Sequence, residues 1–542
     1  MKYNYLYKLL SIILISLLVL SAGGCSKATN FFDYQKEPEA IYKTANKAYL
    51  SMGRVKTLNP VISKDKDVYY IDKLIYNSLF KLDESLLVQN DLAESYKFNK
   101  DKRSVTIIIK KEIKWSNGES LTANDVKFSI DSYKKAFYSK SGIYSSQLNN
   151  IRSVSVNGDS VSINYINSDD MSLENLIFPI IPKNEFKNIN ETLIQNEKFL
   201  PIGSGPYSVE SYNPYSELVL KANEFYSGSK PENTLIFKVV PNDEETIHLI
   251  EPNLITIAYS EKITRNVDFA NLNTNITSYL SNEVDWLGFN MNKAPLSDKK
   301  IRQVIAMSID TKSILESAYY GNGVLSDSIY YPGYLGVKNT GSIYKFDEAE
   351  ATLLLEKAGY NDLNNDGILE NINGNKFIID LLINNNDESR IAAANAIKKN
   401  LAEVKIEANI VAVNFENYNK SILNGEFDIY IGGGKMAENY DLKSLLKSYN
   451  GNPVGYKNPT VDKYLDQLKS GINNEEKIQI YKKLKSLLSE EIPYYPLVYK
   501  TYGVITSKAF NGKVIPIFNN IYIGAEKWSY KYEEPKITSS ND

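Results

Sequence analysis

The sequence predicts an α/β protein built from more than one lobe. Its 542 residues are too many for one small hydrophobic core, so the chain should divide into two or more compact parts. Short strand-like apolar runs alternate along the chain with segments of helical period, and this alternation is typical of α/β folds. Apolar residues make up 43% and charged residues 23%, which is the composition of an ordinary soluble globular protein.

The charge and the cysteine and histidine counts exclude several classes of function. The net charge of −3 gives no basic excess for binding nucleic acid. Cys25 is the only cysteine and His248 the only histidine, so an internal disulfide and a Cys/His metal site are both excluded. We expect no cofactor, and we expect His248 to be a partly buried structural residue. The 41 tyrosines are given little weight, because genome base composition explains them as well as function does.

The N-terminus has the features of an export signal. A basic start precedes an apolar run, Leu9–Leu20, that is too short to span a membrane, and small residues then lead to Cys25. This pattern resembles a bacterial lipoprotein signal. The resemblance implies that residues 1–24 are a signal peptide and that Cys25 is the lipidated first residue of a tether over 25–45. Two or more acyl chains, palmitate among them, would hold the protein at the extracytoplasmic face of the cell membrane.

A strand end, a turn and a helix follow one another at residues 114–128. Asn117-Gly118 predicts the turn, and Thr122 with Asp125 three positions later predicts the cap of the helix. Farther on, apolar residues alternate on both sides of Asn157-Gly158, which predicts a β-hairpin.

Residues 286–310 predict a strand, a loop and a helix. The stretch Trp286–Asn292 is apolar and aromatic, and Pro295 follows it as a breaker. Ser297 is expected to cap the helix. Four apolar residues of this helix then share one face: Ile301, Val304, Ile305 and Ile309.

These segments together resemble one family of transport proteins. They include Lys114–Phe128, the Gly-Ser-Gly-Pro-Tyr stretch Gly203–Tyr207, and Phe289–Asp310, in this order. They resemble the family 5 extracellular solute-binding proteins of peptide ABC importers, and the resemblance covers most of the chain from Val55 to Tyr522. It implies a two-lobed periplasmic-binding-protein-like fold of the class II (cluster C) type, with an extra subdomain inserted in the first lobe.

The resemblance also implies the domain boundaries. Lobe I is expected at 46–62, 200–287 and 497–533, the inserted subdomain at 63–199, and lobe II at 288–496. The chain would leave lobe I near Trp286–Asn292 and return to it near Pro493–Ile505. The ligand would lie between the two lobes, which close around it.

Members of this family grip a peptide as an added strand, which implies two ligand-binding edges in this chain. The candidate residues on these edges are Ser63, Lys64, Asp65 and Lys66, then Gly432, Gly433, Gly434, Lys435 and Met436. Tyr144 and Trp286 are further candidates, although aromatic residues often belong to the core. Glu438 stands nearest to the family's carboxylate that holds the peptide α-ammonium, and Asp441 is second. Both could equally be solvated loop charges, as most charged residues are.

Three stretches mimic known motifs without completing them. Gly432–Lys435 is not a phosphate loop, since Ile429 stands where the first glycine is needed. A nucleophile elbow would need glycine where Ile202 stands. Residues 362–367 match the first half of a calcium loop, but the twelfth position is Asn373 in place of Glu, which favours a polar turn without metal.

The sequence therefore predicts a lipid-anchored monomeric receptor that captures oligopeptides and delivers them to an ABC permease with its ATPase subunits. We expect no enzymatic activity. The family's Gly-Trp and Asp-Tyr pairs are altered after Gly434, so a metal chelate, haem or an oligosaccharide stays open as the cargo. Two further functions stay open as well: a peptide sensor without a transport role, and a surface glycosidase that uses two carboxylates.

Overall fold

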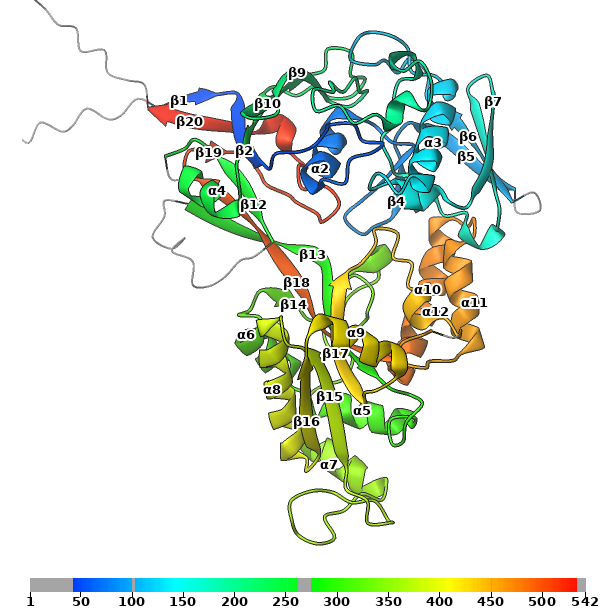
Figure 1. Cartoon of the computed structure of the whole chain (residues 1–542), viewed down its shortest axis with the longest axis vertical. Helices are drawn as coiled ribbons and strands as arrows, with labels where there is room; N and C mark the ends of the chain where they lie inside the picture. The colour runs from blue at the N-terminus through cyan, green and yellow to red at the C-terminus, as the bar shows by residue number, and fades with distance from the viewer. Residues whose placement is uncertain (1–41, 100–102, 251, 262–273, 450, 534–542) are drawn as a thin grey trace, which may run out of the picture. The chain divides into compact units, whose positions relative to one another are not determined.

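A mixed sheet of eleven strands runs through the structure, a computed structural model that describes residues 42–99, 103–250, 252–261, 274–449 and 451–533 (Figure 1). The predicted signal peptide and Cys25 lie outside these residues. The sheet order is β16-β15-β17-β13-β18-β12-β2-β11-β10-β9, with β14 also paired to β18. The strands are β2 (Lys47–Met52), β9 (Tyr207–Asn213), β10 (Glu217–Ala222), β11 (Thr234–Val239), β12 (Ile257–Ser260), β13 (Thr274–Phe289), β14 (Gly323–Val324), β15 (Ile378–Asn384), β16 (Glu407–Val413), β17 (Ile429–Lys435) and β18 (Tyr494–Ser507).

Two long strands, β13 and β18, hold the two halves of this sheet together. They pair antiparallel from Thr274↔Ser507 to Gly288↔Tyr494, with two register shifts on the way. The second half of β13 also pairs with β17, while the second half of β18 pairs with β12. The predicted crossings between the lobes fall at the end of β13 and along β18 (Figure 1). The individual domain boundaries stay predictions.

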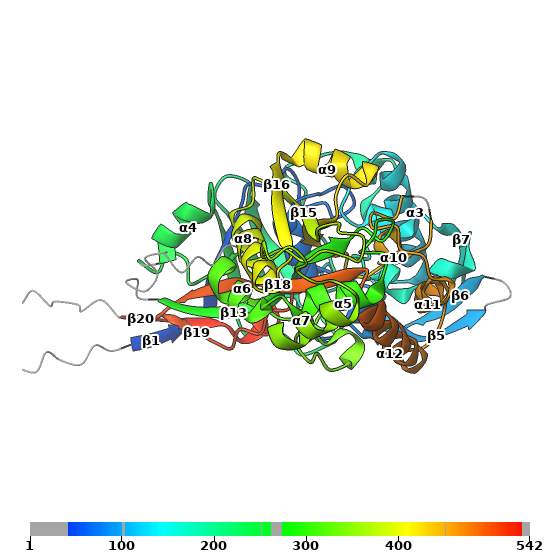
Figure 2. The same cartoon turned by 90° about the horizontal axis from the view of Figure 1, so that it is seen from below.

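Helices cover the sheet and form two large hydrophobic cores among the described residues. In one core, α8 packs against β15 and β16 (Figure 2). The other core contains most of the first half of the chain and also the aromatic residues near α12. The helices of at least eight residues are α2 (Lys66–Ile75), α3 (Ala123–Tyr138), α4 (Asp243–Ile250), α5 (Lys299–Met307), α6 (Thr311–Ala318), α7 (Glu348–Lys357), α8 (Glu388–Glu403), α9 (Phe415–Asn424), α11 (Pro459–Lys469) and α12 (Asn474–Glu491), and α10 (Lys443–Leu446) is a single turn.

A second sheet belongs to the stretch predicted as the inserted subdomain. Its order is β5-β6-β8-β7, and α3 packs against β7 and β8. The predicted cap and hairpin are both confirmed: Thr122 and Asp125 form a capping box at the start of α3, and β7 and β8 meet at Asn157↔Ser160. The smaller strands are β1 (Tyr42–Ala45), β3 (Phe80–Leu82), β4 (Val88–Asn90), β5 (Ala93–Asn99), β6 (Ser104–Ile109), β7 (Ile151–Asn157), β8 (Ser160–Tyr165), β19 (Phe510–Asn511) and β20 (Ser529–Glu533).

Two local predictions are wrong. Asp298, and not Ser297, caps α5, because Asp298 is the last extended residue and its carboxylate accepts the backbone N–H two residues on at 2.8 Å. His248 is exposed rather than partly buried, since α4 turns Ile250 inward and leaves the histidine on the solvent side.

Candidate functional site

One edge of β17 is unpaired where the sequence predicted a ligand. Gly432 to Lys435 pair on one side with β13, from Trp286 back to Glu283. On the other side β15 pairs with β17 only at Ile429 and Tyr430. Among the described residues no strand pairs with this edge beyond Tyr430. A free strand edge offers backbone N–H and C=O groups that an extended chain can pair with.

The three glycines of this edge have different surroundings. A Cβ at Gly433 would lie 2.0 Å from Oδ1 of Asp285, and a Cβ at Gly432 would lie 2.4 Å from the ring of Tyr430. A Cβ at Gly434 would meet nothing within 4 Å. Packing by neighbouring side chains therefore requires glycine at the first two positions, and only Gly434 faces open space.

A buried charge network lies directly under Gly433. Arg390 of α8 donates to Asp285 of β13 through Nη2 at 2.7 Å and Nε at 3.2 Å. The hydroxyl of Tyr319 donates to the same carboxylate at 2.9 Å, and the Lys500 ammonium lies 3.4 Å from it. Burial lowers the pKa of Arg390, but the charge and hydrogen bonds of Asp285 outweigh burial and raise it. These four side chains fix β13, β18, α6 and α8 relative to one another.

No sequence motif indicated this network. Asp285 and Arg390 are 105 positions apart and belong to no motif. The available signal was an aspartate between Val284 and Trp286, inside the otherwise apolar stretch from Val284 to Phe289. A charge at such a position needs a buried partner, but the sequence does not say which residue provides it.

The two predicted edges are linked through one glutamate. Lys435 lies 2.6 Å from Oε2 of Glu261, and Lys66 pairs with Oε1 of the same carboxylate. Both ammonium groups also lie over the ring of Tyr502, at 5.4 and 5.6 Å from its centroid. The structure therefore brings Lys66, at the start of α2, close to Lys435, at the end of β17.

The rest of the first predicted edge forms a capped turn that leads into α2. Ser63 is buried, and its hydroxyl accepts the backbone N–H of Asp65 at 3.2 Å. Its carbonyl accepts the N–H of Ile143 at 3.0 Å. Lys64 is exposed and Asp65 is half-buried. The backbone of Ser63 is thus already paired within the protein, unlike the open edge of β17.

Tyr144 and Trp286 both pack inside the larger core. Tyr144 stacks on Tyr69 with ring centroids 5.6 Å apart, and its hydroxyl donates to Asp72 at 3.4 Å. Trp286 donates its indole N–H to Tyr430 at 3.5 Å. The indole of Trp286 and the phenol of Tyr144 are both buried, so both side chains occupy core positions in this structure.

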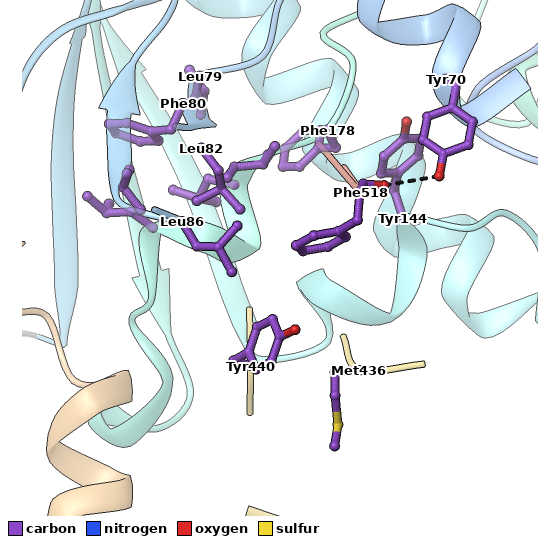
Figure 3. Packing of buried hydrophobic residues seen from close by; sticks show 14 of the residues in the cluster. Tyr70, Leu79, Phe80, Leu82, Leu86, Tyr144, Phe178, Met436, Tyr440 and Phe518 are labelled. Carbon is purple, nitrogen blue, oxygen red and sulfur yellow. Dashed lines mark hydrogen bonds between the residues drawn. The ribbon is translucent and has the colours of Figure 1, made fainter. Parts of the chain in front are cut away.

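A group of tyrosines to which the sequence assigned no role packs beside the predicted site. Tyr330, Tyr334, Tyr440 and Tyr481 contact one another with ring centroids 5.0 to 6.2 Å apart. In Figure 3, Tyr440 and Met436 lie below Phe518, whose carbonyl accepts a hydrogen bond of 3.0 Å from Tyr70. Met436 is buried and is held by backbone contacts to Asn282.

Glu438 and Asp441 differ in their surroundings. The carboxyl group of Glu438 is half-buried and has no hydrogen bond or ion pair with any residue that the structure describes. Burial raises its pKa from 4.5 to about 8. Asp441 is also half-buried, but its carboxylate accepts the backbone N–H of Lys443 at 3.0 Å and so holds the turn into α10. Of the two, only Glu438 lacks a protein partner for its carboxyl group among the described residues.

The calcium-like turn is held by lysines. Lys405 lies 2.8 Å from Asp362, and Lys376 lies 2.5 Å from Asp366. Across the described residues, no cluster of three or more His, Cys, Asp or Glu side chains is arranged to hold a metal. The two carboxylates that the motif supplies are therefore paired with ammonium groups.

Two cavities are lined mainly by residues from the first half of the chain. One of about 400 Å³ lies among residues 59–202 and includes none of the predicted ligand-binding residues. A second, of about 180 Å³, is lined by Lys66, Tyr70 and Glu261 among others. Only the second therefore borders the predicted site.

Residues 88–456, well over half of the chain, match the family described as bacterial extracellular solute-binding proteins, family 5 (middle). The chain belongs to this family. As a family 5 solute-binding protein it is an extracytoplasmic binding protein of a non-catalytic family. None of the helices that the structure describes has the length and apolar character needed to cross a membrane.

Individual relatives support the same assignment. This family 5 protein is 26% identical to the oligopeptide-binding protein AppA of Bacillus subtilis over 544 residues, which cover 96% of this chain and 98% of AppA. The structure of AppA from Bacillus subtilis in complex with a nonapeptide matches with a TM-score of 0.55 at 25% identity, over 90% of this chain and 99% of AppA. NikZ from Campylobacter jejuni, in complex with Ni(L-His), matches with a TM-score of 0.61 at 22% identity, over 89% and 99%. The predicted two-lobed periplasmic-binding-protein-like α/β fold is confirmed.

Proposed function

We propose that this protein is the lipid-anchored, monomeric receptor of a peptide ABC importer. It captures an oligopeptide between its two lobes and presents it to a permease with its ATPase subunits. The peptide would add as a strand to the open edge of β17, at Gly432 to Met436. Similarity to an oligopeptide-binding protein along almost the whole chain supports a peptide as the cargo.

The carboxyl group of Glu438 carries this proposal. It lies two residues after Met436, it is half-buried, and burial raises its pKa to about 8 with no cation close to it among the residues that the structure describes. A peptide α-ammonium would supply the missing positive charge and form a charge-assisted hydrogen bond. Asp441 is the weaker candidate, since its carboxylate already accepts a backbone N–H.

Closure of the lobes would assemble the binding site. Lys66 and Lys435 come from the predicted inserted subdomain and lobe II, and Glu261 comes from lobe I. The contact between Lys435 and Glu261 forms only when lobe II lies close to lobe I. A ligand that touches both sides selects this arrangement, because it gains its full contact energy only there.

The test measures peptide affinity by calorimetry. The ligands are peptides that remain bound to the freshly purified protein, identified by native mass spectrometry and then synthesised with free and with N-acetylated amino termini. Glu438→Gln should cost about 2 to 5 kcal/mol, or roughly a 30- to several-thousand-fold loss of affinity for the free peptide. N-acetylation should weaken binding to the wild type and barely affect the variant.

Asp441→Asn is the matched control and should keep the preference for a free amino terminus. A change of less than about threefold in Glu438→Gln would end the ammonium-anchor proposal. A non-peptide solute is the second candidate, favoured by the altered residues around Glu438. Native mass spectrometry that finds a metal chelate, haem or an oligosaccharide in place of peptides would establish it.

A further inference from the structure

The loop that carries Glu438 is held in place by one residue of the predicted inserted subdomain and by one residue of α11. The side-chain amide of Asn439 donates to Oδ1 of Asn175 at 3.0 Å. The carbonyl of Asn439 accepts a hydrogen bond from the ammonium of Lys469, the last residue of α11. Asn175 lies in η3 (Leu173–Leu176), which belongs to the predicted inserted subdomain. The residue next to Glu438 is therefore fixed from both sides.

A buried ion pair lies beside these contacts. Oε1 of Glu174, also in η3, is 2.6 Å from the ammonium of Lys477 in α12, and the two side chains are 5% and 4% exposed. Ser172 donates a second hydrogen bond to Glu174. Burial alone would raise the pKa of Glu174, but the positive charges of Lys477 and Lys469 and the two hydrogen bonds outweigh it and bring the pKa down to about 2. Glu174 therefore faces Lys477 as a carboxylate.

The physics of a buried ion pair suits a contact that opens and closes. The attraction between the charges roughly offsets the cost of removing both from water, so the pair adds little net stability when it forms. Loss of one partner is different, because the other charge is then left buried without compensation. Such a pair fixes the register of two surfaces and still lets them separate into water.

We propose that Glu174, Asn175, Lys469 and Lys477 are positioning residues for the ligand site: they dock the inserted subdomain on α11 and α12 and thereby hold Glu438 in its binding position. This inference rests on the proposed function, since it assumes that the lobes open and close around a ligand. The site proposed for the peptide α-ammonium at Glu438 is then complete only while η3 is docked on α11 and α12. Peptide recognition and docking of the inserted subdomain become two parts of one closure step.

The first measurement needs no ligand and follows docking directly. Cys25→Ser removes the single cysteine of the chain, and Ser153→Cys on β7 with Lys463→Cys on α11 then carry two nitroxide labels at exposed positions. Pulsed electron paramagnetic resonance reports the distance between the labels. The parent protein should show a short distance for the docked state, either alone or beside a longer one. Lys477→Met should reduce the share of the short distance about tenfold or more.

Two variants separate positioning from general damage to the fold. Glu174→Gln/Lys477→Met removes both charges of the pair and should recover most of the short distance, because neither partner is left buried without the other. Lys469 keeps Asp441 and Asp170 as nearby carboxylates in this variant. Lys483→Met makes the same substitution at an exposed lysine of the same helix and should change nothing. Should Lys477→Met fail to fold, Asn175→Ala removes the contact to Asn439 together with the hydrogen bond that Asn175 donates to Asp170 within the predicted inserted subdomain. This variant should reduce the share of the short distance by a smaller factor than Lys477→Met.

The second measurement concerns Glu438 itself. In Lys477→Met the advantage of a free over an N-acetylated peptide should shrink, and the double variant should restore it. The proposal is overturned when the short distance is absent from the parent protein, is unchanged in Lys477→Met, or is lost equally in the double variant or in Lys483→Met. Failure of peptide binding with the expected distance changes would instead count against the cargo, so the two failures are distinguishable.

Discussion

The guanidinium of Arg390 lies 2.7 Å from the carboxylate of Asp285, and these side chains are 10% and 0% exposed. The pair joins α8 to β13 directly under the backbone of Gly433, where the open edge of β17 begins. Tyr319 and Lys500 approach the same carboxylate. One buried aspartate therefore keeps the helix, the long connecting strands and the proposed peptide edge in a fixed arrangement.

Asp285→Asn should destabilise the protein strongly. The substitution removes the nearer and fully buried counter-charge of Arg390, and loss of one partner of a buried pair costs about 3 to 5 kcal/mol. Urea unfolding followed by circular dichroism measures the change. Asp387→Asn is the control, because its carboxylate lies 3.6 Å from Arg390 and is partly exposed. The control should cost less than about 1 kcal/mol. Equal losses in the two variants would contradict this account of Asp285.

Gly433→Ala and Gly434→Ala should differ sharply in stability. A methyl group at 433 would overlap Asp285 and the carbonyl of Val284, at 2.0 and 2.5 Å, so the strand or the ion pair must shift. Overpacking of this kind costs about 1 to 3 kcal/mol. At 434 the methyl group meets open space, and the change should stay within about 0.5 kcal/mol. Thermal unfolding of both variants checks the difference, and similar melting temperatures would contradict it.

Gly434→Ala also probes the ligand without harming the fold. Since its Cβ would point into open space beside the proposed peptide strand, a lower peptide affinity at unchanged melting temperature would place the ligand there. Unchanged affinity would place the peptide elsewhere on the edge.

Local rules predicted those parts of the fold in which neighbours in sequence decide the structure. The capping box of Thr122 and Asp125 and the turn at Asn157-Gly158 depend on residues within three positions, and both formed as expected. The cap of α5 moved by one residue to Asp298, since serine and aspartate can each cap a helix and the tertiary path after Pro295 decides between them.

The site was harder to predict, because its electrostatics depend on residues far apart in sequence. The sequence ranked Glu438 before Asp441 only by its position relative to the family pattern, and only the turn into α10 shows that Asp441 already has a backbone partner. The link from Lys66 through Glu261 to Lys435 joins three distant segments that no motif connects. The resemblance indicated the correct family, whereas the partner of each charged side chain could be identified only from the three-dimensional structure.

Cys25→Ser should release the protein from membranes. The apolar run before Cys25, the small residues beside it and the absence of any other cysteine in the sequence are the basis of this prediction. Two or more acyl chains hold a protein stably at a bilayer, and the serine variant would carry none on this residue. Cell fractionation with mass spectrometry of the mature protein measures the outcome. A variant that stays in the membrane fraction with an unchanged mass would rule out lipid attachment at Cys25.

Glu438 should make the stability of the ligand-free protein depend on pH. Burial raises the pKa of its carboxyl group from 4.5 to about 8 in the folded protein, so the folded state holds this proton more tightly than the unfolded chain does. The resulting stabilisation is fully present below pH 4.5 and is lost as the pH rises to about 8, where the half-buried carboxylate must carry a charge. Glu438→Gln has no proton to lose at this position. Scanning calorimetry should therefore show the melting temperature of the variant rising relative to the wild type between pH 5 and pH 8, while other titrating groups affect both proteins alike.

Asp441→Asn, which leaves Glu438 in place, should show no such relative rise. A temperature difference between Glu438→Gln and wild type that stays constant across this range would mean that Glu438 is solvated, and the ammonium site would then lose its physical basis.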